Sequence, residues 1–228
     1  DIVNPLLWEI GHTAYFQEFW VLRRNSEDSL IPNADKIYDS IHIPHESRWE
    51  LPLMSRKNIY QYLQDIRDKV LEKLDKNKCS QEDIFHIVYS IFHEDMHTEA
   101  FTNTRQILGL SKPFHKKNVS KFEIDNNTKY EDVEIIGGEY LIGSSKSASF
   151  VFDNEKWMHP VNIDTFRIAS TPVTQKEFLN FVENGGYSES NYWTDEGWEW
   201  CRKEKAAHPV YWEKGQNGKW NRRLFNQW

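Results

Sequence analysis

The clearest helical signal in this chain lies in residues 80–100, which read SQEDIFHIVYSIFHEDMHTEA. Ser80 followed three residues later by Asp83 resembles the capping box of reciprocal hydrogen bonds that opens a helix. Residues spaced three or four apart then form one helical arc: Phe85, Val88, Phe92, Met96 and Glu99. We expect this arc to face a core and the helix to end near Gly109.

Two further amphipathic helices are expected earlier in the chain. In the first, Asn4 is a candidate cap and Pro5 suits the first turn. One stripe of this helix carries Trp8, His12, Tyr15, Phe16 and Phe19. The second helix spans about residues 55–75, and its apolar face carries Ile59, Leu63, Ile66, Val70 and Leu74. Residues 25–54 between them have little periodicity, which predicts a long connection. Because bundles usually close with four helices, the fourth could precede residue 1.

The pattern changes after about residue 111. Residues 112–129 are polar and basic, as in a linker. Glycine-punctuated runs typical of strands follow at 133–136, 140–142 and 161–168, and a short helix with a Thr174–Glu177 capping box is expected to end before Gly185. The sequence therefore predicts an α plus α+β architecture, with a helical bundle in residues 1–125 and an α+β domain in residues 126–228.

Composition narrows the classes of function. The 228 residues carry a formal charge of −7, which argues against a basic nucleic-acid-binding face. Mean hydropathy is −0.75, and we find neither a signal peptide nor an apolar run long enough to span a bilayer. Two cysteines make no disulfide framework, so we expect a cytoplasmic protein. The chain opens on Asp1 and stops at Trp228, and we interpret it as a piece of something longer.

Histidines are the strongest candidates for chemistry. His93 and His97 are four residues apart on one helix face, so both imidazoles can reach one metal ion. With Glu94, they also match the His-Glu-x-x-His pattern of zinc peptidases, although a pair at this spacing can arise by chance. His12 lies in an aromatic stripe, where a histidine must either form an internal hydrogen bond or bind a ligand. Together the three could form a facial set with open positions for water, dioxygen or substrate.

Other polar residues have weaker assignments. Glu99 falls on the apolar arc, so its carboxylate could hydrogen-bond to a ligand histidine, form a buried salt bridge or sit at an exposed helix edge. The connection and its exit carry His42, His45, Arg48 and Arg56, which could bind an anionic substrate or simply be solvated. His86, one turn before the pair, is interpreted as a helix-edge residue.

Motifs in both halves resemble the sulfoxide-synthase family of ergothioneine biosynthesis. NPLLWEIGHTAYF at residues 4–16 and HEDMHTE at 93–99 resemble the Trp-x-x-x-His and His-x-x-x-His-x-Glu motifs of its DinB-like four-helix bundle. Further segments resemble the early part of its C-type-lectin-like, formylglycine-generating-enzyme-like domain: GGEY (137–140), FDNE (152–155), HPV (159–161), PVT (172–174), NGGY (184–187) and WTDEGW (193–198). The resemblance covers nearly the whole chain in order.

The resemblance implies an oxygen-dependent, non-haem Fe(II) enzyme with His12, His93 and His97 as iron ligands. Such enzymes couple a thiol or selenol donor to C2 of the imidazole of hercynine. Basic residues before the second helix bind donor carboxylates in the ergothioneine branch. Here residues 45–53 hold few of them, which looks more like the selenoneine branch and leaves Arg48 as the candidate substrate-binding residue. The family's catalytic tyrosine and its hercynine-binding segments are expected beyond Trp228.

Two alternatives from other classes stay open. A metal-free bundle with a lectin-like domain could be a non-catalytic module that binds a small ligand or a partner. A DinB-like zinc hydrolase or thiol transferase would use the same histidines with a different metal and without dioxygen.

Overall fold

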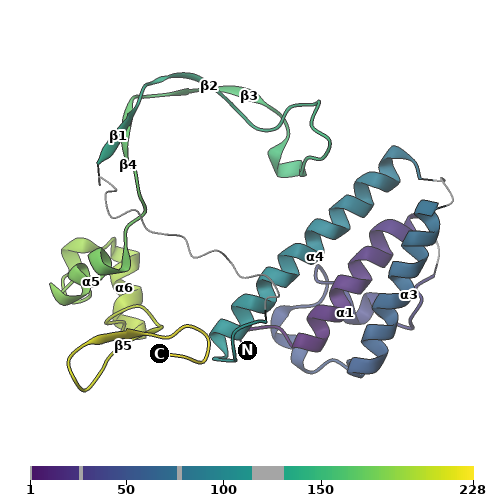
Figure 1. Ribbon diagram of the computed structural model, residues 1–228, viewed down its shortest axis with the longest axis horizontal. Helices are drawn as coiled ribbons and strands as arrows, with labels where there is room; N and C mark the ends of the chain where they lie inside the picture. Colours follow the sequence, from purple (N-terminus) through teal and green to yellow (C-terminus); the bar gives the residue numbers. More distant parts are fainter. Residues whose placement is uncertain (1, 26–27, 76–78, 115–130) are drawn as a thin grey trace. The chain divides into compact units, whose positions relative to one another are not determined.

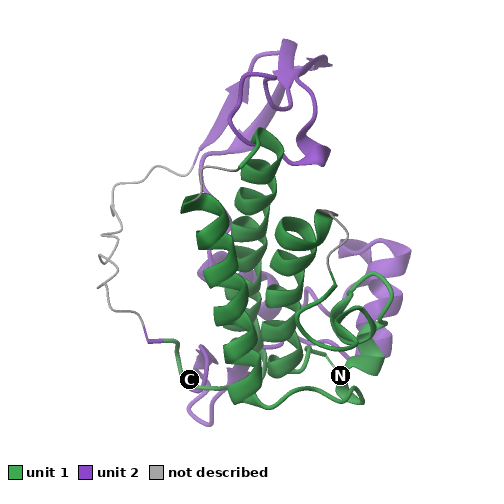
Figure 2. Cartoon of the chain, turned by 90° about the vertical axis from the view of Figure 1, so that its right-hand side faces the viewer, with its two compact units in different colours: residues 1–113 green, residues 114–228 purple. Residues whose placement is uncertain are grey.

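The computed structural model describes residues 2–25, 28–75, 79–114 and 131–228, and it divides the chain into two compact units, residues 1–113 and 114–228 (Figure 1, Figure 2). The boundary expected between residues 125 and 126 lies outside the described residues, as does most of the expected linker.

Unit 1 is helical. Its elements are α1 (Leu6–Gln17), a π-helical turn (Glu18–Leu22), a 3-10 turn (Arg23–Asn25), α2 (Ala34–Tyr38), a 3-10 turn (His45–Trp49), α3 (Arg56–Asp75) and α4 (Gln81–Ile107). Helix α1 lies between α3 and α4 and packs against both (Figure 1). The described residues of unit 1 thus supply three long helices, and a fourth bundle helix stays a prediction.

Two apolar clusters hold these helices together. Where α1, α3 and α4 meet, the buried side chains are Ala14, Val21, Tyr62, Ile66, Val70 and Ile87. Where α1 meets α2, they are Trp8, Tyr15, Ala34 and Tyr38. The long connection predicted for residues 25–54 thus contains a short helix, α2, and the fully buried ring of its Tyr38 packs onto α1.

The predicted cap of α4 is confirmed, but its predicted core-facing arc is half-buried only at Phe85 and Val88 and is wrong beyond them. Ser80 Oγ accepts a hydrogen bond from the Asp83 amide, and the Asp83 carboxylate accepts one from the Ser80 amide. Phe92 and Met96, however, are 39% and 51% exposed. The buried residues of α4 are Ile87, Ser90 and Thr104. Apolar periodicity misplaces this face because the side of α4 toward α1 carries Ser90, His93 and His97 beside the apolar Ile87.

The predicted cap of α1 also differs. Pro5 occupies the N-cap position without a side-chain hydrogen bond. The Asn4 side chain instead accepts a hydrogen bond from Arg48.

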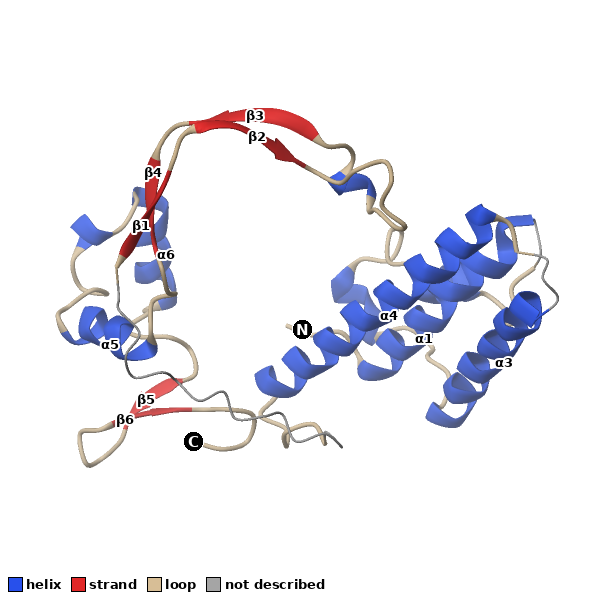
Figure 3. Ribbon diagram, turned by 45° about the horizontal axis from the view of Figure 1, so that its top comes forward, coloured by secondary structure: helices blue, strands red, loops and turns tan. Residues whose placement is uncertain are grey.

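Unit 2 combines short strands and helices (Figure 3). Its elements are β1 (Asp132–Ile135), β2 (Gly138–Ile142), a 3-10 turn (Asp153–Glu155), β3 (His159–Ile163), β4 (Phe166–Ala169), α5 (Gln175–Glu183), a 3-10 turn (Ser190–Tyr192), α6 (Asp195–Glu204), β5 (Trp212–Lys214) and β6 (Trp220–Arg222). Antiparallel pairs form between β1 and β4, β2 and β3, and β5 and β6.

The first two strand pairs share one register, so they continue each other as a two-stranded ribbon (Figure 3). The run predicted at 161–168 is broken between β3 and β4. Gly137 lies opposite this break, and a Cβ there would be 2.7 Å from the Thr165 backbone nitrogen, so the close approach requires glycine. The capping box of α5 is confirmed, since Thr174 Oγ1 accepts from the Glu177 amide.

Across the described parts of both units, every helix is too short or too polar to be a candidate for a membrane span.

Candidate metal centre

Three histidine side chains from α1 and α4 meet inside unit 1. His12 Nε2 lies 3.2 Å from His93 Nε2, and His97 Nε2 lies 3.2 Å from the same atom. All three nitrogens lie within 4.8 Å of one another. His12 is 4% exposed, whereas the other two rings are half-buried. The structure therefore brings together the three residues that the sequence singled out.

The opposite ring nitrogens of His12 and His97 are anchored. His12 Nδ1 lies 2.7 Å from the Tyr38 carbonyl oxygen, and His97 Nδ1 lies 3.0 Å from Glu9 Oε1. Because a carbonyl and a carboxylate can only accept, each Nδ1 carries the proton and donates it. In a neutral ring this leaves a lone pair on Nε2, which is the arrangement that metal-binding histidines use.

The donor set fits a transition-metal ion. His12 Nε2 and His97 Nε2 both present lone pairs toward His93 Nε2. If His93 Nε2 carries a proton, that single proton can form a full hydrogen bond with only one of these two acceptors. A cation at their centre would accept all three lone pairs and move the His93 proton to Nδ1. Among the described residues, that buried Nδ1 has no hydrogen-bond partner. Three neutral imidazoles suit Fe(II) or Zn(II) and leave coordination positions open.

The rings of His12 and His93 are neutral at pH 7, because their pKa values are lowered. Burial is the largest cause that lowers the pKa of His12 to about 4, and the nearby charges of His97 and Arg48 act in the same direction. Burial, followed by the neighbouring rings of His12 and His97, lowers the pKa of His93 to about 3. Both rings are therefore ready to bind a cation without first losing a proton at neutral pH.

These shifts predict that the metal-free protein loses stability in acid. Between the ordinary histidine pKa of 6.5 and the lowered values, the unfolded chain binds protons that the folded chain does not. Lowering the pH from 7 to 5 should therefore reduce the free energy of unfolding by about 2 kcal/mol for each of these two histidines. Urea unfolding in the presence of a chelator measures this. The His93→Gln variant has no group at this position that titrates between pH 7 and 5, so its free energy of unfolding should fall less over this range. An equal fall in the variant would contradict the lowered pKa of His93.

Aromatic rings hold the imidazoles on their other sides. The Trp8 ring is stacked on His12, with centroids 4.9 Å apart and planes 5° apart. Phe16 is stacked on His93, with centroids 3.6 Å apart. Both rings come from α1, one turn before and one turn after His12, so helical spacing places them there.

Gly11 leaves room for the ring of Tyr38, the residue whose carbonyl orients His12. A Cβ on Gly11 would lie 2.2 Å from Cε1 of the fully buried Tyr38 ring. We expect Gly11→Ala to lower the free energy of unfolding by about 1–3 kcal/mol through overpacking. It should also weaken metal binding, because Tyr38 must move together with its carbonyl. Chemical unfolding and metal titration measure the two effects.

A compensating change controls this prediction. Adding Tyr38→Leu to Gly11→Ala should recover part of the stability, because the smaller side chain frees space beside residue 11. If Gly11→Ala alone is as stable as the unmodified protein and binds metal equally well, the packing argument is wrong.

The structure does not bring Glu99 to the histidines. Glu99 is exposed, and the carboxylate that contacts a histidine of the set is Glu9, which is 2% exposed. Sequence reasoning missed Glu9 and the Tyr38 carbonyl. Glu9 precedes His12 by three residues in a largely apolar helix, which is a signal that could have found it. His86 lies outside the set, stacked on Trp20 with centroids 5.5 Å apart.

The basic residues of the connection separate into two groups. Arg48 is half-buried, and its Cζ lies 3.9 Å from the centroid of the Trp8 ring. His42 is exposed and pairs with Asp39 at 2.7 Å, and Arg56 is also exposed. Of these residues, Arg48 is therefore placed against the wall of the candidate centre.

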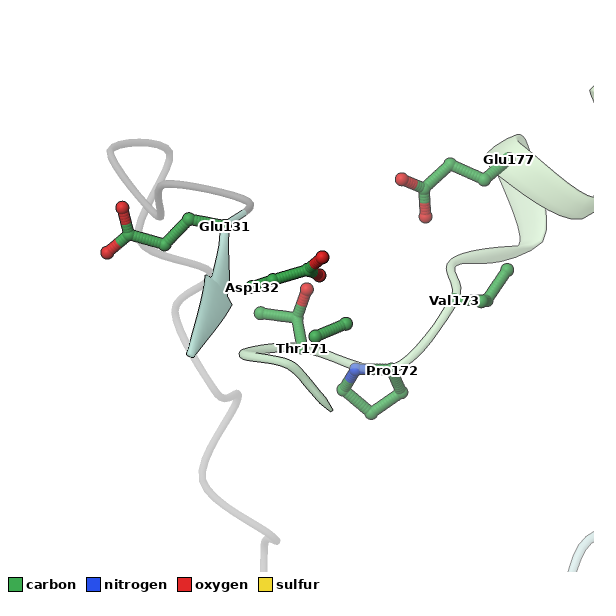
Figure 4. Close-up of a pocket in the computed structure, with 7 residues that line it drawn as sticks. Glu131, Asp132, Thr171, Pro172, Val173 and Glu177 are labelled. Carbon is green, nitrogen blue, oxygen red and sulfur yellow. The ribbon is translucent and has the colours of Figure 1, made fainter. Parts of the chain in front are cut away.

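A pocket of about 330 Å³ lies in unit 2, between the start of β1 and the segment before α5 (Figure 4). Glu131, Asp132 and Glu177 line it, but the Glu177 carboxylate accepts hydrogen bonds from Thr174 at the helix cap. In the described parts of the chain, the histidine set is the one group of three side chains placed to hold a metal ion.

Comparison with known proteins finds relatives that match most of the chain. The chain is 27% identical over 223 residues to the hercynine oxygenase of Mycolicibacterium smegmatis and 28% identical over 218 residues to that of Mycobacterium tuberculosis. These matches cover 92% and 94% of this chain but only 50% and 51% of the relatives. The chain thus spans about half the length of the curated relatives it matches.

The second half of the chain also matches a family. Residues 104–222 match the sulfatase-modifying factor enzyme 1-like domain, FGE-sulfatase, as the motifs from residue 137 onward led us to expect. Since this match covers more than half of the 228 residues, the chain belongs to the FGE-sulfatase family.

Proposed function

We propose that this chain is the metal-binding part of an oxygen-dependent, non-haem iron enzyme that acts on hercynine and couples a thiol or selenol donor to C2 of its imidazole. The observation that carries the proposal is the convergence of three histidine Nε2 atoms at 3.2 Å spacings. This convergence occurs in a chain that is 27% identical over 92% of its length to a hercynine oxygenase.

His12, His93 and His97 would hold the iron. A bound Fe(II) ion supplies the one-electron chemistry that a reaction with dioxygen requires. The protein contributes fixed orientation: the Tyr38 carbonyl and the Glu9 carboxylate each hold a proton on Nδ1, so that Nε2 of His12 and His97 stays available. The Trp8 and Phe16 rings cover one face of His12 and His93 and limit access of water to them.

In this proposal, residues 1–125 are a DinB-like metal-binding bundle, and residues 126–228 are the first part of the formylglycine-generating-enzyme-like domain. The donor is a thiol or a selenol. Residues 45–53 contain one arginine and no lysine, which favours the selenoneine type over a γ-glutamylcysteine enzyme.

The test uses the full-length protein that contains this chain, loaded with Fe(II) under controlled oxygen. Hercynine is supplied with a thiol donor in one series and a selenol donor in the other. We expect a coupled product and substrate-dependent oxygen uptake with at least one donor, and neither in the His93→Ala variant. Bound metal without product or oxygen uptake would favour a zinc hydrolase or a thiol transferase. A purified protein that binds no metal would favour a non-catalytic binding module.

A further inference from the structure

Arg48 is connected to the candidate metal centre through one indole ring. Its guanidinium carbon lies 3.9 Å from the Trp8 ring centroid, a cation–π contact. The same Trp8 ring is stacked nearly parallel to His12, at 4.9 Å between centroids. Movement of the guanidinium therefore changes the support of a ring that holds a proposed ligand.

The guanidinium is held by oxygen atoms of its own chain. Nη1 donates to Asn4 Oδ1 at 3.0 Å, and Nη2 and Nε donate to the Ile43 carbonyl at 3.1 and 3.3 Å. Asn4 lies just before α1, and Ile43 lies in the connection after α2. Because an arginine binds a carboxylate best through two parallel N–H groups, a guanidinium whose donors are already engaged on both sides is a poor substrate ligand.

Trp8 is fixed at its edge as well as on its face. Its Nε1 donates to the Ile37 carbonyl at 2.6 Å, and the side chain is 1% exposed. The next residue in the chain, Tyr38, supplies the carbonyl that accepts from His12 Nδ1. The segment from Ile37 to Arg48 thus contacts both the indole and the imidazole.

Charge gives a second link. Glu9 is 2% exposed, and its carboxylate contacts His97 Nδ1. Besides burial, the Arg48 charge lowers the pKa of His12, and the Glu9 charge opposes the lowering of the Arg48 pKa by burial. Glu9, His12 and Arg48 are therefore linked electrostatically. A positive charge that acts on a buried carboxylate offsets part of the cost of burying that carboxylate.

We infer that Arg48 is a positioning residue for the metal centre, which holds Trp8 against His12 and is not a ligand for the substrate. The inference rests on the proposed metal centre but not on the proposed reaction. It also replaces the substrate-binding role expected from the sequence with a role that can be tested without any substrate.

The test is a Co(II) titration of the full-length, metal-free protein, followed by its visible absorption. Arg48→Met keeps a long apolar side chain but removes the charge and the hydrogen-bonding fork. We expect it to weaken Co(II) binding by about 10-fold, the low end of the range for residues that contact a metal ligand directly, because Arg48 acts through Trp8, and to alter the spectrum. Arg48→Lys should recover part of the affinity because it restores the charge. The exposed Arg56→Met is the matched control and should behave like the unmodified protein.

A milder variant guards against misfolding. Asn4→Ala removes one acceptor of Arg48 without changing Trp8 or His12, and it should shift the affinity and the spectrum in the same direction by a smaller amount. Three results would overturn the inference: unchanged Co(II) binding in Arg48→Met, a raised KM for an acidic substrate as its only defect, or a lowered melting temperature with normal Co(II) affinity. If the unmodified protein itself binds no Co(II), the proposed metal centre is wrong. This result is distinguishable from a failure of the Arg48 inference, in which the unmodified protein does bind Co(II).

Discussion

Replacing His93 with alanine is expected to abolish tight metal binding. His93 Nε2 is the atom that both other Nε2 atoms approach at 3.2 Å, so its removal leaves His12 and His97 without the central member of the set. A change beside a ligand typically costs 10–100-fold in affinity, and loss of a ligand should cost more than 100-fold. Metal content after purification and Co(II) titration both measure this effect.

His86→Ala is the matched control for this prediction. His86 lies on the same helix as His93, and its ring is stacked on Trp20, outside the set. Its Nδ1 pairs with the Glu82 carbonyl at 2.7 Å. This variant should keep one equivalent of metal. One equivalent of tightly bound metal in the His93→Ala protein would show that the three histidines do not form the site.

Replacing Glu18 with alanine is expected to cause a large loss of stability in unit 1. The Glu18 carboxylate is 1% exposed and accepts from the Tyr62 hydroxyl at 2.5 Å, Ser29 Oγ at 2.8 Å and the Leu30 amide at 2.5 Å. Burial and the neighbouring carboxylate raise the pKa of Tyr62, so its hydroxyl stays a donor. Glu18→Ala leaves three donors without this acceptor and opens a cavity, which should cost about 3–5 kcal/mol.

Urea unfolding of unit 1 variants measures this loss. Tyr62→Phe removes a single donor and should cost about 1–2 kcal/mol. Glu94→Ala, at an exposed position of α4, should change the free energy of unfolding by less than about 0.5 kcal/mol. A Glu18→Ala protein as stable as the Glu94→Ala control would mean that the buried carboxylate is not the anchor of residues 29–30.

Much of the local structure followed from short-range patterns. The helices α3 and α4, and the caps at Ser80 and Thr174, were predictable because capping and amphipathic spacing act between residues three or four apart. The same rule placed His93 and His97 on one face. The predicted arc of α4 was wrong beyond Val88 because apolar periodicity marks only apolar contacts, and the face toward α1 also carries Ser90, His93 and His97.

The expectation that Glu99 contacts a ligand histidine shows that short-range patterns also fail to identify partners at the candidate metal centre. The place of Glu99 on the arc made a contact with a histidine plausible, yet the carboxylate that reaches His97 is Glu9, 88 residues earlier in the chain. Likewise, the Tyr38 backbone carbonyl orients His12, and any residue type carries a carbonyl. Spacing around the histidines gives no signal for the Tyr38 carbonyl, and for Glu9 it gives only a position three residues before His12, not the contact with His97.

Residue order alone specified which side chains could bind a metal and that two of them share a helix face, because helical geometry relates neighbours three or four positions apart. Only the packing of α1 against α4 decided that His12 reaches His93, 81 residues away, and that Trp8, Glu9, Tyr38 and Arg48 surround them. The physical reason is that contacts between distant segments depend on which buried surfaces fit together, and this fit is a property of the whole folded unit.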